Sequence, residues 1–349
     1  MTSPPLSGRR THRDTVHFLE AEDGAALTTI RVSGAAEPTL GPVLLLHGVG
    51  MRAESFRPPA IRSLVDVLLD AGWDVWLGNW RGSIDLPPMP WALDDVARFD
   101  VPALVQYVAA QTGSPTVKIV AHCQGAAAAS MAVVAGLVPE VDTVIANGVS
   151  LHPLVPGFAK VKLHLLRPLL GGGEPYVDIA WGDGPERGVP WIARTAVRLA
   201  HAECRNPSCN MASFALGSGH PALWRHENID AATHRWLGGE LGKIPLSWYA
   251  QMAMSDRARQ YVSVRPHTGL ARRWGSQVPA SQARFTLLSG DRNRAFLPTS
   301  QRATHDYLER HQPGRHTLKI IPGYAHTDVF IGRRAHVDVF PGILTALSA

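Results

Sequence analysis

One segment constrains the fold of this chain more than any other. The apolar run 117–123 (VKIVAHC) predicts a buried strand, and the alanine-rich run 126–135 directly after it predicts a helix. The chain must therefore turn sharply around Cys123. Such a turn needs small residues on either side, so that strand and helix can pack closely, and Ala121 and Gly125 meet this need. The segment predicts a nucleophile elbow, a strained turn that presents a reactive side chain.

Strand and helix patterns alternate along much of the chain, which is typical of an α/β protein whose mostly parallel sheet carries helices on both faces. Two strands are expected within residues 16–32, and the others at 43–48, 74–80, 117–123, 143–150, 284–290 and 317–323. The alternation stops over residues 151–280. We therefore expect a core made of residues 16–150 and 281–349, with a large helical lid, 151–280, inserted after the sixth main strand.

The lid segment also holds six of the ten tryptophans, which favours a lipophilic substrate or an aromatic core of its own. They are Trp181, Trp191, Trp224, Trp236, Trp248 and Trp274.

Composition excludes several classes of protein. The net charge of +5 comes from scattered arginines and not from a basic run, so we expect no nucleic-acid partner. Residues 1–15 predict a flexible arm, and no apolar segment follows Arg9-Arg10 as an export signal would require. No stretch approaches the roughly 18 apolar residues of a membrane span. The expected compartment is the cytoplasm.

Three cysteines are too few for a disulfide framework in a chain of 349 residues. Cys204 and Cys209 are close enough in sequence to pair, or to supply half of a metal site that His201 or His220 would join. We expect instead two reduced thiols in the core, and neither a metal nor a cofactor. Cys123 differs from both because of its place in the turn.

The turn predicts that Cys123 is a nucleophile. The helix that begins there directs its positive end and free N–H groups at the sulfur, which favours the thiolate. Residues 46–50 (LHGVG) end an earlier strand, where this kind of fold supplies one oxyanion-hole N–H group. We assign the two N–H groups to the backbones of Val49 and Gln124, with Gly48 supporting the loop.

His326 follows the last predicted strand, and the chain order nucleophile, acid, histidine predicts that it is the base. The third member stays open. The triad acid is expected in the loop after strand 284–290, and its usual position relative to Gly290 falls on Asn293. The carboxylate in this loop belongs instead to Asp291. An amide that only orients the ring can suffice beside a thiolate. Asp328 is a further candidate, although we expect it to hold the loop.

Five motifs together resemble one branch of the α/β-hydrolase family, the hydrolase partners of cholesterol-oxidase-like (glucose–methanol–choline) oxidoreductases. They lie at residues 79–83, 91–95, 121–125, 290–298 and 323–328, and the AHCxG elbow at 121–125 is the most specific. The resemblance runs from about residue 40 to the C-terminus and implies an esterase or lipase. This chain departs from the branch at Ala325, where glycine is expected, and carries no fused oxidoreductase.

These features predict an enzyme that forms a thioester acyl-enzyme on Cys123. The acyl group would come from a small-molecule ester, lactone or thioester, including a thioester bound to a carrier. Two outcomes stay open, namely hydrolysis and transfer of the acyl group to an amine, alcohol or thiol in secondary-metabolite biosynthesis. A third hypothesis is a non-catalytic binding protein that kept the fold.

Overall fold

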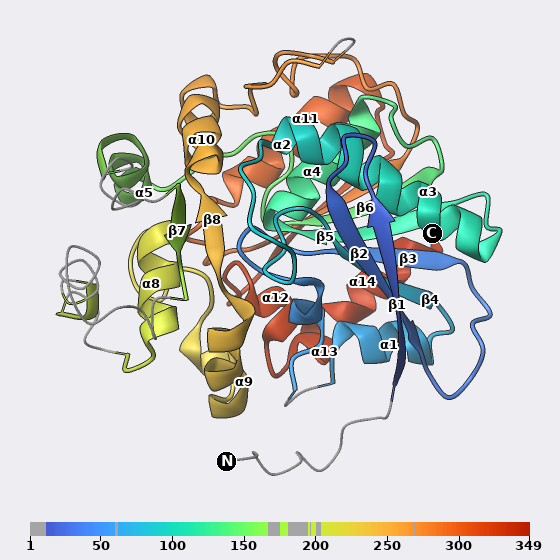
Figure 1. Ribbon diagram of the computed structural model, residues 1–349, viewed down its shortest axis with the longest axis horizontal. Coiled ribbons are helices and arrows are strands. Elements are labelled where there is room, and N and C mark those ends of the chain that lie inside the picture. The colour runs from blue at the N-terminus through green and yellow to red at the C-terminus, as the bar shows by residue number, and fades with distance from the viewer. Residues whose placement is uncertain are drawn as a thin grey trace.

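The protein is described from a computed structural model, which Figure 1 shows as a ribbon. The described residues are 12–59, 62–166, 175–180, 195, 197–199, 204–267 and 270–349. Most of the predicted arm, together with Trp181, Trp191 and His201, lies outside these ranges. The first strand begins at Arg13, three positions inside the segment expected to be an arm.

A single eight-stranded sheet forms the centre of the molecule, in the order β1-β2-β4-β3-β5-β6-β9-β10. Strand β2 runs antiparallel to both of its neighbours, and every other pair is parallel. The strands are β1 Arg13–Glu20, β2 Ala26–Ser33, β3 Pro42–Leu46, β4 Asp74–Asn79, β5 Val117–His122, β6 Val141–Asn147, β9 Arg284–Gly290 and β10 Thr317–Ile321. The predicted fold class is confirmed.

Helices connect these strands and cover the sheet. They are α1 Leu64–Asp70, α2 Leu93–Asp95, α3 Val101–Thr112, α4 Cys123–Val134, α11 Thr299–His311, α12 Asp328–Ile331, α13 Ala335–Asp338 and α14 Phe340–Ser348. Every residue of α4 is buried, because its alanines let the helix lie close to the sheet. The helix expected at 93–111 contains a π-helical turn, Val96–Asp100, between α2 and α3.

The residues between β6 and β9 are called the lid segment below. Its described elements are α5 Gly157–Val161, β7 Tyr176–Asp178, α8 Pro207–Leu216, α9 Ala231–Trp236, β8 Lys243–Pro245 and α10 Leu246–Ala258. Strands β7 and β8 form an antiparallel ribbon, and these elements gather at one side of the sheet in Figure 1. Trp224, Trp248 and Trp274 are buried within this segment. Among the described residues, no helix combines the length and apolarity needed to cross a membrane.

Candidate active site

Cys123 occupies the strained position that the sequence predicts. It is the first residue of α4, directly after β5, and its φ of 53° lies in the left-handed region that residues with a side chain rarely adopt. Gly125 is needed because a Cβ there would lie 2.4 Å from the carbonyl oxygen of His47 and 2.8 Å from that of Leu46. Ala121 is fully buried in β5 between Leu46 and Ala146 of the neighbouring strands. The turn has the sharp strand-to-helix geometry of the predicted elbow and packs against the end of β3.

Replacing Gly125 by alanine is expected to lower the free energy of unfolding by about 3 kcal/mol, because the new Cβ meets backbone atoms that cannot move aside. Urea denaturation of the full chain measures the change. Gly239→Ala is the matched control, since a Cβ at Gly239 meets nothing within 4 Å. Equal loss in both variants would contradict the close approach of α4 to β3.

Backbone N–H groups converge on the Cys123 sulfur. Those of Val49 and Gln124 lower the pKa of the thiol, and these are the two groups assigned above to an oxyanion hole. The Gln124 side-chain nitrogen lies 3.9 Å from the sulfur, and its oxygen accepts a hydrogen bond of 3.0 Å from the Tyr261 hydroxyl. Gly48 lets the loop pass close to the elbow, since a Cβ there would lie 3.1 Å from the Cβ of Cys123.

Burial controls the charge of the site. It raises the pKa of the Cys123 thiol to about 12, and the neighbouring N–H donors offset only part of this. Burial also lowers the pKa of His326 to about 3 and that of His122 well below its usual value. In this closed structure the neutral thiol and the neutral imidazole are favoured. Burial thus opposes the thiolate, whereas the N–H groups of Val49 and Gln124 favour it.

His326 is held by its backbone from both the core and the lid segment. Its N–H group and that of Thr327 donate to the carbonyl oxygen of Leu223, at 3.1 and 2.7 Å. Its own carbonyl oxygen accepts a hydrogen bond of 3.0 Å from the amide nitrogen of Asn147. That nitrogen also lies 2.9 Å from Nδ1 of His122. The lid segment thus helps to fix the loop that carries the predicted base.

The Asn293 side chain lies beside Nδ1 of the His326 ring. Its oxygen accepts from the backbone N–H groups of Ala295 and Phe296, at 3.0 and 3.1 Å. Because those groups can only donate, the amide nitrogen must face His326, whose Nδ1 lies 3.1 Å away. Nδ1 therefore accepts, and the neutral ring carries its proton on Nε2. That tautomer orients the ring but cannot take a proton at Nε2.

The two candidate carboxylates lie elsewhere. Asp291 is exposed, and its carboxylate accepts from the backbone N–H of Gly323 at 2.8 Å. Asp328 is fully buried and accepts from the N–H groups of Ala325 and Arg225 and from the Asn228 amide, at 2.8, 3.1 and 2.7 Å. Asp328 thus ties the loop of His326 to the lid segment, which is the holding role expected of it.

Replacing Asp328 by alanine is expected to lower the free energy of unfolding by about 3 kcal/mol, because it leaves buried donors without an acceptor. Thermal unfolding followed by circular dichroism at neutral pH gives the comparison. The control is Asp306→Ala, an exposed carboxylate on α11 that is expected to change stability little. Unchanged stability in D328A would show that the carboxylate does not hold this loop.

Cys123 and His326 line one cavity together with residues of the lid segment. The lid contributes Leu216, Leu223, Trp224, Leu241 and Trp248. The free volume is about 20 Å³, the space of roughly one water molecule. The lid segment therefore leaves little free space beside the sulfur in this structure.

Three residues that support the site were not singled out from the sequence. Asn147 ends β6, Tyr261 follows α10, and Leu223 acts through its carbonyl oxygen. The end of a parallel strand is a frequent place for functional side chains, so Asn147 could have been found in this way. A backbone acceptor and a lid tyrosine leave no comparable signal.

Comparison with known proteins gives a consistent picture. Residues 41–190 match the model of the alpha/beta hydrolase fold family. A probable lipase of Schizosaccharomyces pombe is 31% identical over 42% of this chain, and the match spans only 35% of that protein's length. Lipase member K of Mus musculus is 23% identical over 94% of this chain and 86% of its own length. The solved monoacylglycerol lipase of Paleococcus ferrophilus covers 92% of this chain and 99% of its own, with a TM-score of 0.56 and 15% identity.

Proposed function

We propose that this chain, which has the α/β hydrolase fold, is a cysteine-nucleophile enzyme that hydrolyses an ester, lactone or thioester of a lipophilic acyl group. The observation that carries the proposal is the sharp turn at Cys123, which has a left-handed backbone at the junction of β5 and α4. His326, which lines the same cavity, is the proposed base.

The proposed reaction follows from these groups. The sulfur attacks the acyl carbon while the thiol proton passes to Nε2 of His326. The oxygen anion that develops is stabilised by the N–H groups of Val49 and Gln124. The proton then goes to the leaving alkoxide or thiolate, and a thioester remains on Cys123. Water attacks this thioester, gives its proton to His326, and the released sulfur takes that proton back.

The contact with Asn293 determines how readily His326 can accept the thiol proton. Before Nε2 can accept a proton, the ring must move its own proton to Nδ1, which faces the donating amide of Asn293. Turning that amide would break two hydrogen bonds to backbone N–H groups. We therefore propose Asn293, and not Asp291, as the positioning residue of the triad, and we expect it to slow acylation.

The lining of the cavity supports a lipophilic acyl group. Trp224, Trp248, Leu223 and Phe296 surround the space beside the sulfur. The names of two relatives, a probable lipase and lipase member K, point to the same substrate class. The resemblance to the hydrolase partners of cholesterol-oxidase-like oxidoreductases is a further part of this proposal, and so is a cytoplasmic location.

The thiol is expected to react with iodoacetamide slowly at neutral pH and faster as the pH rises. With the pKa of Cys123 near 12, the thiolate fraction should grow about tenfold per unit between pH 7 and 10. Timed labelling with mass mapping of the Cys123 peptide measures this, and Cys123→Ala shows the background. A rate that is already flat from pH 6 would contradict the neutral resting site and indicate a preformed thiolate–imidazolium pair.

Transfer of the acyl group to another acceptor is the second candidate. A thioester is more electrophilic toward amines and thiols than an oxygen ester, and the closed apolar cavity leaves little room for water. The trapped acyl-enzyme should be followed in buffer and with added amines, alcohols or thiols. Faster decay with one acceptor class supports transfer, whereas equal decay in all of them supports hydrolysis.

The orientation of Asn293 also favours the third candidate, a binding protein without turnover. This alternative and the proposed enzyme differ in one result, the formation of an acyl-enzyme. If an activated ester never acylates Cys123 at any pH from 6 to 10, the binding protein is the better account.

A further inference from the structure

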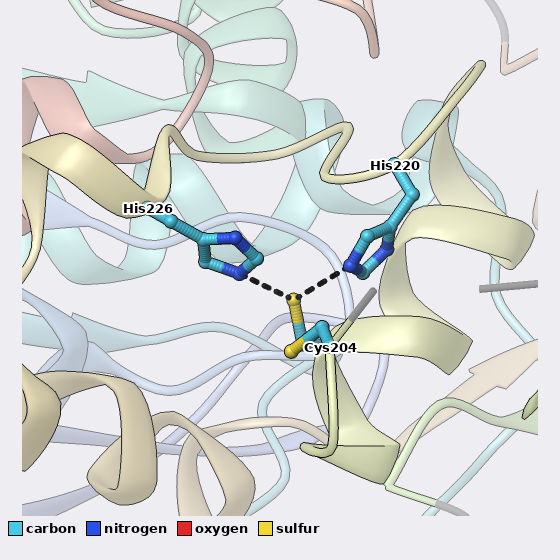
Figure 2. Close-up of side chains that lie close together, drawn as sticks. Cys204, His220 and His226 are labelled. Carbon is cyan, nitrogen blue, oxygen red and sulfur yellow. Dashed lines mark hydrogen bonds between the residues drawn. The ribbon is translucent and has the colours of Figure 1, made fainter. Parts of the chain in front are cut away.

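Four side chains of the lid segment converge away from Cys123. One donor atom from each of Cys204, Cys209, His220 and His226 lies within 4.8 Å of all the others. Cys204 precedes α8, Cys209 lies in the first turn of α8, and the two histidines follow that helix. In Figure 2 the rings of His220 and His226 approach one cysteine sulfur from two sides, and a dashed line joins each ring to it. The chain therefore folds back on itself around these donors.

We propose that these four residues bind one zinc ion. Two thiolates and two imidazoles are the donor set of structural zinc sites, whose tetrahedral ligands lie about 3.3–3.8 Å apart. The Cys209 sulfur is 3.4 Å from Nε2 of His226 and 3.9 Å from Nε2 of His220, close to those values. The order along the chain, Cys-x4-Cys and then His-x5-His, also falls within the spacing of such sites.

Hydrogen-bonding groups and a helix end lie close to the two sulfurs. The backbone N–H of Asn206 lies 3.4 Å from the Cys204 sulfur, and Nε2 of His234 lies 3.7 Å from it. Cys209 stands at the positive end of the ten-residue helix α8, where a thiolate is stabilised. Zinc binding would release both thiol protons to solvent. We assign His234 to support Cys204, outside the four ligands.

The donor set also selects the metal and its role. Thiolate and imidazole ligands favour zinc over magnesium or calcium, which prefer oxygen. Four protein ligands fill the tetrahedral sphere and leave no position for a substrate, so the ion would be structural. Both cysteines are buried, in agreement with such a closed site.

The position of the site suggests what the zinc stabilises. The short segment between His220 and His226 contains Leu223 and Trp224. The carbonyl oxygen of Leu223 accepts from the N–H groups of His326 and Thr327, and Trp224 lines the cavity at Cys123. A zinc ion that fixes both ends of this segment would hold the lid against the loop of His326. The metal site itself does not depend on the proposed acyl-transfer chemistry.

Metal analysis of the full chain, produced with zinc in the medium and purified under reducing conditions without chelator, tests the proposal. We expect about one zinc per chain in the native protein, in Cys123→Ser and in His234→Gln. Cys209→Ser and His226→Asn should lose at least nine-tenths of it. The assignment would be overturned if the native protein contained no zinc, or if both ligand variants retained it.

Because a variant that lacks a metal ligand can fail to fold, a second test uses the native chain alone. After removal of zinc by a chelator, cobalt(II) should bind at about one equivalent and give the visible bands of a tetrahedral site with sulfur-to-cobalt charge transfer. Cobalt spectra of an octahedral site would contradict the proposal. So would a disulfide between Cys204 and Cys209 in the chain as purified.

Discussion

Replacing Asn293 by aspartate is expected to raise the rate constant for acylation of Cys123 by about two orders of magnitude. In the native site the Asn293 amide donates to Nδ1 of His326 and keeps the ring proton on Nε2. An aspartate could keep the N–H groups of Ala295 and Phe296 on one oxygen and accept Nδ1–H on the other. The ring would then be free to take the thiol proton at Nε2, and the gain of about 2.7 kcal/mol corresponds to about a hundredfold in rate.

The measurement is the burst of p-nitrophenol on mixing enzyme with p-nitrophenyl butyrate. Asp291→Asn is the matched control, because the Asp291 carboxylate hydrogen-bonds to Gly323 and its removal should change the burst less than twofold. If D291N abolished the burst while N293D left it unchanged, Asp291 would be the third member of the triad and the assignment of Asn293 would be wrong.

Replacing Cys123 by serine is expected to lower the acylation rate by about 10³–10⁴-fold, which is the cost of pairing a serine with a histidine in the wrong tautomer. A hydroxyl is a weaker acid than a thiol, so it depends more strongly on a base that accepts at Nε2. The double variant C123S/N293D should recover at least about a hundredfold relative to C123S, since the carboxylate restores that tautomer.

The four proteins form a double-mutant cycle measured with the same ester. Thermal unfolding of each variant shows whether the fold is kept, and serine is close to cysteine in size. The account would be contradicted by a C123S protein within tenfold of the native rate, or by a double variant no faster than C123S. The first result would show that the reaction does not depend on the sulfur. The second would show that Asn293 does not control the tautomer of His326.

The sequence predicts the fold and the elbow because both depend on local patterns. Residues 117–135 contain the strand, the turn and the helix, and the glycine at 125 is required by backbone atoms within a few ångströms. Val49 and Gln124 were assigned from their places after β3 and after Cys123, and their role as an oxyanion hole stays a prediction. The insertion predicted at residues 151–280 stays a prediction; β6 ends at Asn147 and β9 begins at Arg284.

The charge of Cys123, the partner of His326 and the cysteine–histidine cluster depend instead on contacts between distant parts of the chain. The charge of Cys123 is set by burial, which involves lid residues about 100 positions away, such as Leu223 and Trp224. The contact of Asn293 with His326 depends on how the loop after β9 turns, and the sequence alone leaves Asp291 as a competitor. Cys204, Cys209 and His220 are a possible metal site in the sequence, whereas the approach of His226 to them depends on how the chain after α8 folds back.

Mass spectrometry of the acid-quenched protein during turnover of p-nitrophenyl butyrate tests the central claim most directly. We predict one butyryl group on the peptide that contains Cys123, removed by neutral hydroxylamine as a thioester is, and no such adduct in Cys123→Ala. An adduct on another residue, or release of p-nitrophenol by C123A at the native rate, would contradict the account.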